Sequence, residues 1–149
     1  MTPTTFYNHF QDKYDLIVWI YTTMVENAMN RIDNESYEWK DTLLEGLKYS
    51  VDNRQFLINA IMHTNGQNSF VNHVANIDIK ALSDYIKRTQ NWEELPVDIE
   101  AWIKIYCYGI VQLSCDWLID KMPIPLEEFV KLLEKALPEP LKKYLYNFD

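Results

Sequence analysis

Glycine is scarce in this chain: three glycines and six prolines stand among 149 residues. Because glycine and proline mark the turns between short strands, their rarity and the long stretches between them predict helices rather than an all-β fold. Hydrophobic residues make up 48% of the chain, which is enough for a real core. We therefore expect one all-α domain.

Cysteine and histidine are also rare. Cys107 and Cys115 are too few for a disulfide framework, and their spacing in a predicted helix favours two reduced core thiols. His9, His63 and His73 stand far apart and lack the spacing of metal ligands. The sequence also lacks a glycine-rich phosphate loop and a nucleophile motif. We expect no enzymatic activity, no metal site and no cofactor.

Positive charge is in short supply: 14 Lys and Arg against 22 Asp and Glu leave a net charge of −8. DNA affinity depends on neutralising phosphates, and DNA-binding domains carry a basic patch for this. Residues 1–13 contain only Asp12 and Lys13 as charged side chains, so this chain should bind DNA weakly.

No apolar run approaches the roughly 18 residues of a membrane span, and no signal peptide is visible, which predicts a cytoplasmic protein with no membrane partner.

Apolar residues recur at helical spacing through most of the chain. Asp12 is the expected N-cap of a first long helix, and Pro138 and Pro140 are expected to end the last one, leaving a short tail. The expected helices cover about Lys13–Ile32, Trp39–Val51, a segment with Phe56 to Ile61, Phe70–Val74, Ile79–Thr89, Val97–Ile119 and Pro125–Ala136.

The predicted helix Val97–Ile119 is apolar nearly all round, which is typical of a helix buried on several faces. Gly109 lies in its middle and costs about 1 kcal/mol relative to alanine. A close helix crossing would justify that cost, because glycine lets two backbones approach each other.

The run Thr5-Phe6-Tyr7-Asn8-His9-Phe10, followed by Lys13 and Leu16, resembles the junction between the DNA-recognition helix and the connecting helix of TetR-type transcriptional regulators. The segment Tyr106-Cys107-Tyr108-Gly109-Ile110-Val111, with Trp117-Leu118 and Ala136-Leu137-Pro138, is similar to the subgroup of dihydroxyacetone kinase operon activators. The resemblance implies a TetR-like helical regulatory domain with a C-terminal helix pair forming a dimer bundle. Residues 1–11 would be a remnant of the recognition helix, and residues 12–149 the effector-binding and dimerisation domain. Because only Met1, Thr2, Pro3 and Thr4 precede the run, we expect the first two helices of the helix-turn-helix to be absent.

Two sets of site residues follow from this resemblance. The first set is the DNA-contacting residues, which would be Thr4, Thr5, Tyr7, Asn8, His9 and Lys13. In the alternative interpretation of this N-terminal run, Phe6 and Phe10 are core anchors and the polar residues only cap a helix end. The interface of a homodimer would contain Tyr106, Gly109, Ile110, Leu113, Trp117, Phe129, Leu132 and Leu133.

Aromatic residues are frequent and suggest a ligand cavity between helices, where bundles usually form pockets. The alternative is that these aromatic stripes are ordinary core. The pocket candidates are Tyr49, Phe56, His63, Trp102 and Tyr106, with Trp39 and Tyr108 as further aromatic residues and Asn65, Gln67 and Asn68 at the mouth beside His63.

The resulting hypothesis is the ligand-sensing and dimerisation core of a TetR-type regulator. A small-molecule effector or a partner protein would control DNA binding by the intact protein. The alternative is a protein-interaction or heterodimerisation module that does not bind DNA.

Overall fold

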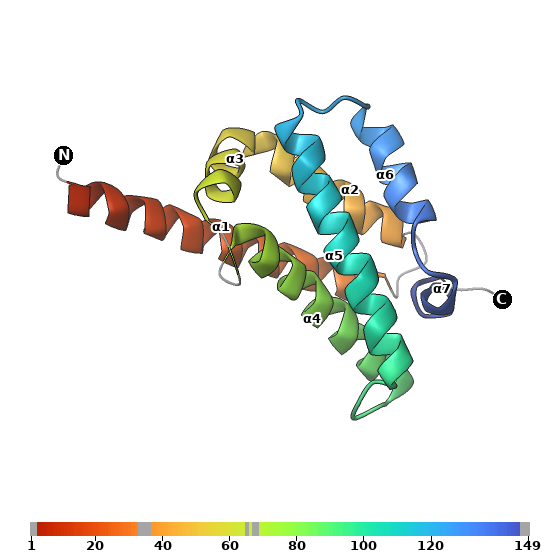
Figure 1. Ribbon diagram of the computed structural model, residues 1–149. Coiled ribbons are helices and arrows are strands. Elements are labelled where there is room, and N and C mark those ends of the chain that lie inside the picture. The colour runs from red at the N-terminus through yellow and green to blue at the C-terminus, as the bar shows by residue number, and fades with distance from the viewer. Residues whose placement is uncertain (1–2, 33–36, 65, 67–68, 147–149) are drawn as a thin grey trace.

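Seven helices and no strand are found in the computed structural model, which describes residues 3–32, 37–64, 66 and 69–146 and the side chains from Asp12 onward. Figure 1 shows α5 crossing the molecule in front of α2, with α4 beside it and α7 near the C-terminus. The helices are α1 (Pro3–Arg31), α2 (Trp39–Asp52), α3 (Arg54–His63), α4 (Phe70–Gln90), α5 (Val97–Ile119), α6 (Leu126–Lys135) and α7 (Glu139–Leu145).

Helix α1 is continuous from Pro3 to Arg31, so the predicted helix start at Asp12 is wrong. Proline is favoured in a first helical turn, and no glycine or proline follows it in this segment. Near the middle of α1, the ring of Tyr14 packs edge to face against the rings of Phe70 and His73 on α4. The N-terminal half of α1 projects away from the other helices (Figure 1).

Helix α4 is a single element, where the sequence predicted two helices with a break before Ile79. Its start follows the ordinary capping rule, because Ser69 accepts a hydrogen bond from the backbone amide of Asn72. Packing of α4 on α1 and α5 holds the intervening residues in the helix. Asp78, which the prediction left between two helices, therefore lies inside one.

Helix α7 replaces the tail predicted after Pro138. Pro138 is its N-cap and Pro140 lies in its first turn, where a missing amide hydrogen costs no helical hydrogen bond. Leu141 and Leu145 are buried, and α7 packs on α5. The two prolines thus end one helix and begin the next.

Helix α5 begins and ends where the sequence predicted and packs on α2, α3, α4 and α7. Helix α6 instead packs mainly on α2. Tyr106 of α5 joins α2 to α6 through two hydrogen bonds. Its hydroxyl accepts from Trp39 Nε1 at 2.9 Å and donates to the Leu133 carbonyl at 2.7 Å. The amide of Leu137 bonds to Glu134 instead, so the tyrosine supplies a partner to a carbonyl in the last turn of α6.

We expect Tyr106→Phe to lower the free energy of unfolding by about 2–3 kcal/mol, because it leaves a buried indole N–H and a buried carbonyl without their partner. Tyr108→Phe is the matched control. Tyr108 is on the same helix but 46% exposed, so its change should stay within about 0.5 kcal/mol. Urea denaturation measures both variants, and equal losses would contradict the assigned role of Tyr106.

Candidate functional site

A cavity of about 110 Å³ lies among the first five helices, with Leu133 of α6 at its edge. Helices α1 and α2 supply 15 of its 27 lining residues, so these two helices form most of the wall. Most lining side chains are apolar. The polar ones are Tyr21, Thr42, Glu45, Tyr49, Ser50, Asp78 and Ser114.

Asp78 and Tyr21 form a hydrogen bond on the cavity wall. The Tyr21 hydroxyl donates to Asp78 Oδ1 at 2.8 Å and so ties α1 to α4. Burial raises the pKa of Asp78 to about 7, against the opposing effect of the hydrogen bond from Tyr21. Burial and the neighbouring carboxylate raise the pKa of Tyr21 well above its ordinary value. The tyrosine therefore stays a neutral donor, while Asp78 changes its charge near neutral pH.

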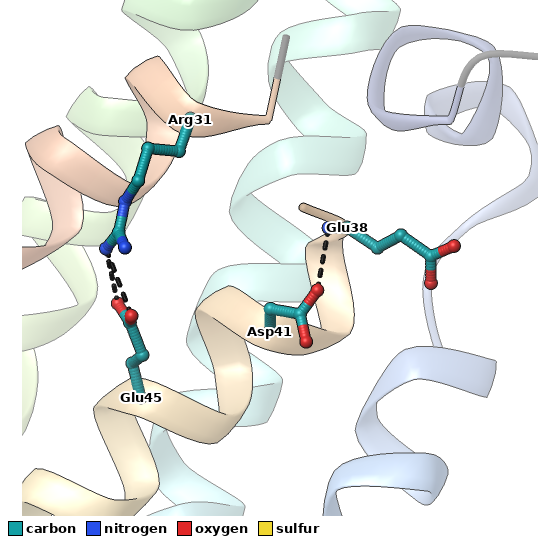
Figure 2. Close-up of polar contacts among 4 residues, drawn as sticks. All are labelled: Arg31, Glu38, Asp41 and Glu45. Carbon is teal, nitrogen blue, oxygen red and sulfur yellow. Dashed lines mark hydrogen bonds and ion pairs between the residues drawn. The ribbon is translucent and has the colours of Figure 1, made fainter. Parts of the chain in front are cut away.

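The second carboxylate on the cavity wall already has a cationic partner. Glu45 accepts two hydrogen bonds from Arg31 Nη2, at 2.9 and 3.0 Å, as Figure 2 shows. Nearby, Asp41 accepts from the backbone amide of Glu38 at the start of α2. Asp78 has no ion pair among the residues that the structure describes.

Of the pocket candidates, Tyr49 lines the cavity and the other four lie elsewhere. Phe56 is half-buried against the core, and His63 is exposed at the end of α3. Trp102 is 38% exposed on α5, and Tyr106 is buried with its hydroxyl bonded as described above. The mouth candidates Asn65, Gln67 and Asn68 are outside the described residues. Of the two further aromatic residues, Trp39 lines the cavity and Tyr108 is exposed.

Sequence reasoning missed Asp78 and Tyr21. One signal was present: Ala75, Asp78 and Leu82 are spaced as residues of one helical face, and both apolar neighbours are buried. An acidic residue at a core position of a helix is unusual and points to a functional or paired group. The spacing was not applied to Asp78 because the sequence predicted a break in the helix before Ile79.

An apolar stripe runs along the outer side of α5. It consists of Trp102, Ile105, Gly109 and Leu113, which are spaced three or four residues apart; the exposed fractions of Ile105 and Leu113 are 62% and 49%. Adding a Cβ atom at Gly109 would meet no other atom within 4 Å. The close crossing expected at Gly109 is thus not made by the described part of this chain.

The predicted dimer residues divide into two groups. Gly109, Leu113 and Leu132 are exposed and accessible to a second copy. The others are turned into the core of their own chain, and Trp117 and Phe129 stack on each other with ring centroids 4.9 Å apart. The buried members are Tyr106, Ile110, Trp117, Phe129 and Leu133. Because α5 is apolar on several sides, sequence spacing could not separate its inner side from its outer side.

The predicted DNA-contacting residues lie on the projecting half of α1. Lys13 is exposed. The backbone of Thr4, Thr5, Tyr7, Asn8 and His9 is helical, but their side chains are outside the described residues.

Neither a metal centre nor a membrane span is found in the described part of the chain. No group of three His, Cys, Asp or Glu side chains is placed to hold a metal ion there. None of its helices has the length and apolar character needed to cross a membrane. Cys107 and Cys115 are free and buried, and burial raises the pKa of Cys115 to about 12, so that residue is a neutral thiol.

Comparison with known proteins identifies the family. Residues 37–139, from just before α2 to the first residue of α7, match the family model described as a transcriptional regulator C-terminal region, of the TetR type. No curated protein and no solved structure gives a significant match. The match covers more than half of the chain and agrees with the all-α architecture. The chain therefore belongs to the TetR-type transcriptional regulators, of which it contains the C-terminal region.

Proposed function

We propose that this chain is the effector-sensing and dimerisation core of a TetR-type transcriptional regulator. The observation that carries the proposal is the apolar cavity between the helices, whose wall includes seven residues of α1. Ligand sites in helix bundles are concave and mostly apolar, with a few polar groups that orient the ligand. The cavity of this chain has these properties.

Helix α1 connects the cavity to the N-terminus, so a change in its packing at the cavity would move its N-terminal end. One half of α1 lines the cavity, and the other half projects from the bundle (Figure 1). The hydrogen bond between Tyr21 and Asp78 and the ion pair between Arg31 and Glu45 hold α1 against α4 and α2. A ligand that binds one arrangement of α1 more tightly than another shifts the population toward it. In an intact dimer, that shift would change the separation of two DNA-reading heads.

The dimerisation part of the proposal rests on the stripe of α5. A helix of a monomeric protein normally turns its apolar side inward, and a contiguous exposed apolar surface marks an interaction site. A second copy would cover Ile105 and Leu113 and would give Gly109 the close helix crossing that its lack of a side chain permits.

The same stripe also supports a second candidate function, in which the chain pairs with a different protein instead of with itself. Light scattering of the purified chain separates the two: a dimer favours self-association, whereas a monomer at micromolar concentration favours heterodimerisation.

The effector cavity can be tested with Gly46→Leu. Gly46 lines the cavity, and a Cβ atom added there meets only Tyr21 Cε2, at 3.9 Å, which is ordinary contact. Gly46→Ala therefore leaves the cavity open and is the control, whereas the leucine side chain fills it. In thermal-shift measurements with benzyl alcohol, we expect stabilisation of the unmodified chain and of Gly46→Ala but not of Gly46→Leu. Equal stabilisation of all three proteins would show that benzyl alcohol binds elsewhere.

A further inference from the structure

We infer that the effector of this cavity is a small apolar amine, whose ammonium group pairs with the carboxylate of Asp78 while its hydrocarbon part fills the space between α1 and α2. The inference rests on the proposed sensing function and adds the chemical class of the ligand. Three observations carry it: the size of the cavity, the sign of its charges and the incomplete hydrogen bonding of Asp78.

The cavity size limits the hydrocarbon part. Its volume is about 110 Å³, and apolar cavities of about 150 Å³ hold a molecule such as benzene. Wall residues such as Ile17, Val25 and Leu57 offer dispersion contacts but no hydrogen bonds. The cavity is no larger than these benzene-holding cavities, so the hydrocarbon part of the ligand is at most one benzene-sized ring or a branched aliphatic group, rather than a polar framework such as a sugar or a nucleotide.

The charges on the wall favour a cation. Glu45 and Asp78 are its two ionisable carboxyl groups, and the described lining includes no Lys, Arg or His. Arg31 neutralises Glu45 from the edge. Asp78 has no cationic partner among the described residues, and its ionised form would repel an anionic ligand.

The hydrogen bonding of Asp78 leaves room for a ligand. Its Oδ1 atom accepts from the neutral Tyr21 hydroxyl, and a carboxylate accepts about four hydrogen bonds through its two oxygens. An ammonium group supplies up to three donors and the missing positive charge. The raised pKa of Asp78 agrees with this assignment, because a nearby cation favours the ionised carboxylate and would lower that pKa.

Bound amine would also act on the packing of α1. The carboxylate that holds Tyr21 of α1 against α4 is the group that the ammonium would contact. Binding at Asp78 therefore changes the contact that positions α1, which links ligand chemistry to the proposed sensing function.

Calorimetric titration with benzylamine and benzyl alcohol at pH 8 tests the inference, because the two compounds have nearly the same shape and differ in charge. We expect benzylamine to bind the unmodified chain at least tenfold more tightly than benzyl alcohol. Asp78→Asn should abolish this preference while still binding the alcohol. Asp84→Asn is the matched control, since Asp84 lies on the same helix with its side chain 47% exposed and paired with Lys80; it should keep the preference.

The outcomes separate this inference from the function on which it rests. If benzyl alcohol binds as tightly as benzylamine, or if Asp78→Asn leaves the ratio unchanged, the amine assignment is wrong but the cavity remains a ligand site. If neither compound binds at millimolar concentration and Gly46→Leu changes nothing, the sensing function and the amine assignment both fail.

Discussion

Replacing Ile105 and Leu113 together by glutamate should convert a dimer of this chain into a monomer. In the isolated chain these side chains are 62% and 49% exposed, so their replacement leaves the core intact. In the proposed dimer they are covered by the second copy, and a carboxylate buried there without a partner costs about 3–5 kcal/mol. We expect the dissociation constant of the dimer to rise by at least about a hundredfold, since each 1.4 kcal/mol is a factor of about ten.

Light scattering coupled to size exclusion measures the change, and circular dichroism verifies that the variant stays helical. Val97→Glu is the control: Val97 is 84% exposed on the same helix, but at its first turn and outside the stripe. It should leave the dimer unchanged, because an acidic residue in the first turn of a helix is favourable. A double variant that remains a dimer would place the interface on another surface.

The same experiment at Phe129 would not test dimerisation. Phe129 is 2% exposed and stacks on Trp117 inside one chain. A charge at this position would unfold the chain, so a loss of dimer could not be attributed to the interface. The structure thus restricts the informative positions to the outer side of α5 and to Leu132 of α6.

Asp78→Asn should stabilise the protein at pH 8 and have a much smaller effect at pH 4. The folded-state pKa of Asp78 is raised to about 7 from an ordinary value of 3.8. Between these values the folded state binds more protons than the unfolded state, so the free energy of unfolding falls as the pH rises through this window. Above pH 7 the whole penalty of ionising this partly buried carboxyl group is present. Asparagine removes the penalty and keeps an oxygen for the Tyr21 hydroxyl.

A pKa raised from 3.8 to about 7 corresponds to about 4 kcal/mol, and we expect about 1–3 kcal/mol because the side chain of Asp78 is only half-buried. Urea denaturation of both proteins at pH 4, 6 and 8 measures the difference. Asp84→Asn should show no comparable gain at pH 8, because its partner Lys80 is exposed and surface pairs contribute about 0–1 kcal/mol. A gain from Asp78→Asn that is equal at all three pH values would contradict the assigned protonation.

Local sequence signals predicted the helices that have clear ends. Helix α5 lies between Pro96 and the turn near Pro123, and a continuous apolar pattern fills the space between them. Helix α2 was predicted equally well. The errors at α1, α4 and α7 have a common form: a capping residue, a polar stretch or a proline was interpreted as a helix end. At α4 the chain continues as helix because neighbouring helices bury its apolar side. Asp12, Asp78 and Pro140 are the residues concerned.

The sequence by itself determined that the chain is all-α, that its excess of acidic residues argues against strong DNA binding, and that its N-terminal run resembles a TetR-type junction. These properties are carried by composition and short-range spacing. Only the tertiary structure decided which side of α5 is exposed and which polar residues face the cavity. Asp78 and Tyr21 are 57 residues apart in the chain, and no local pattern encodes a contact that arises from the packing of α1 against α4.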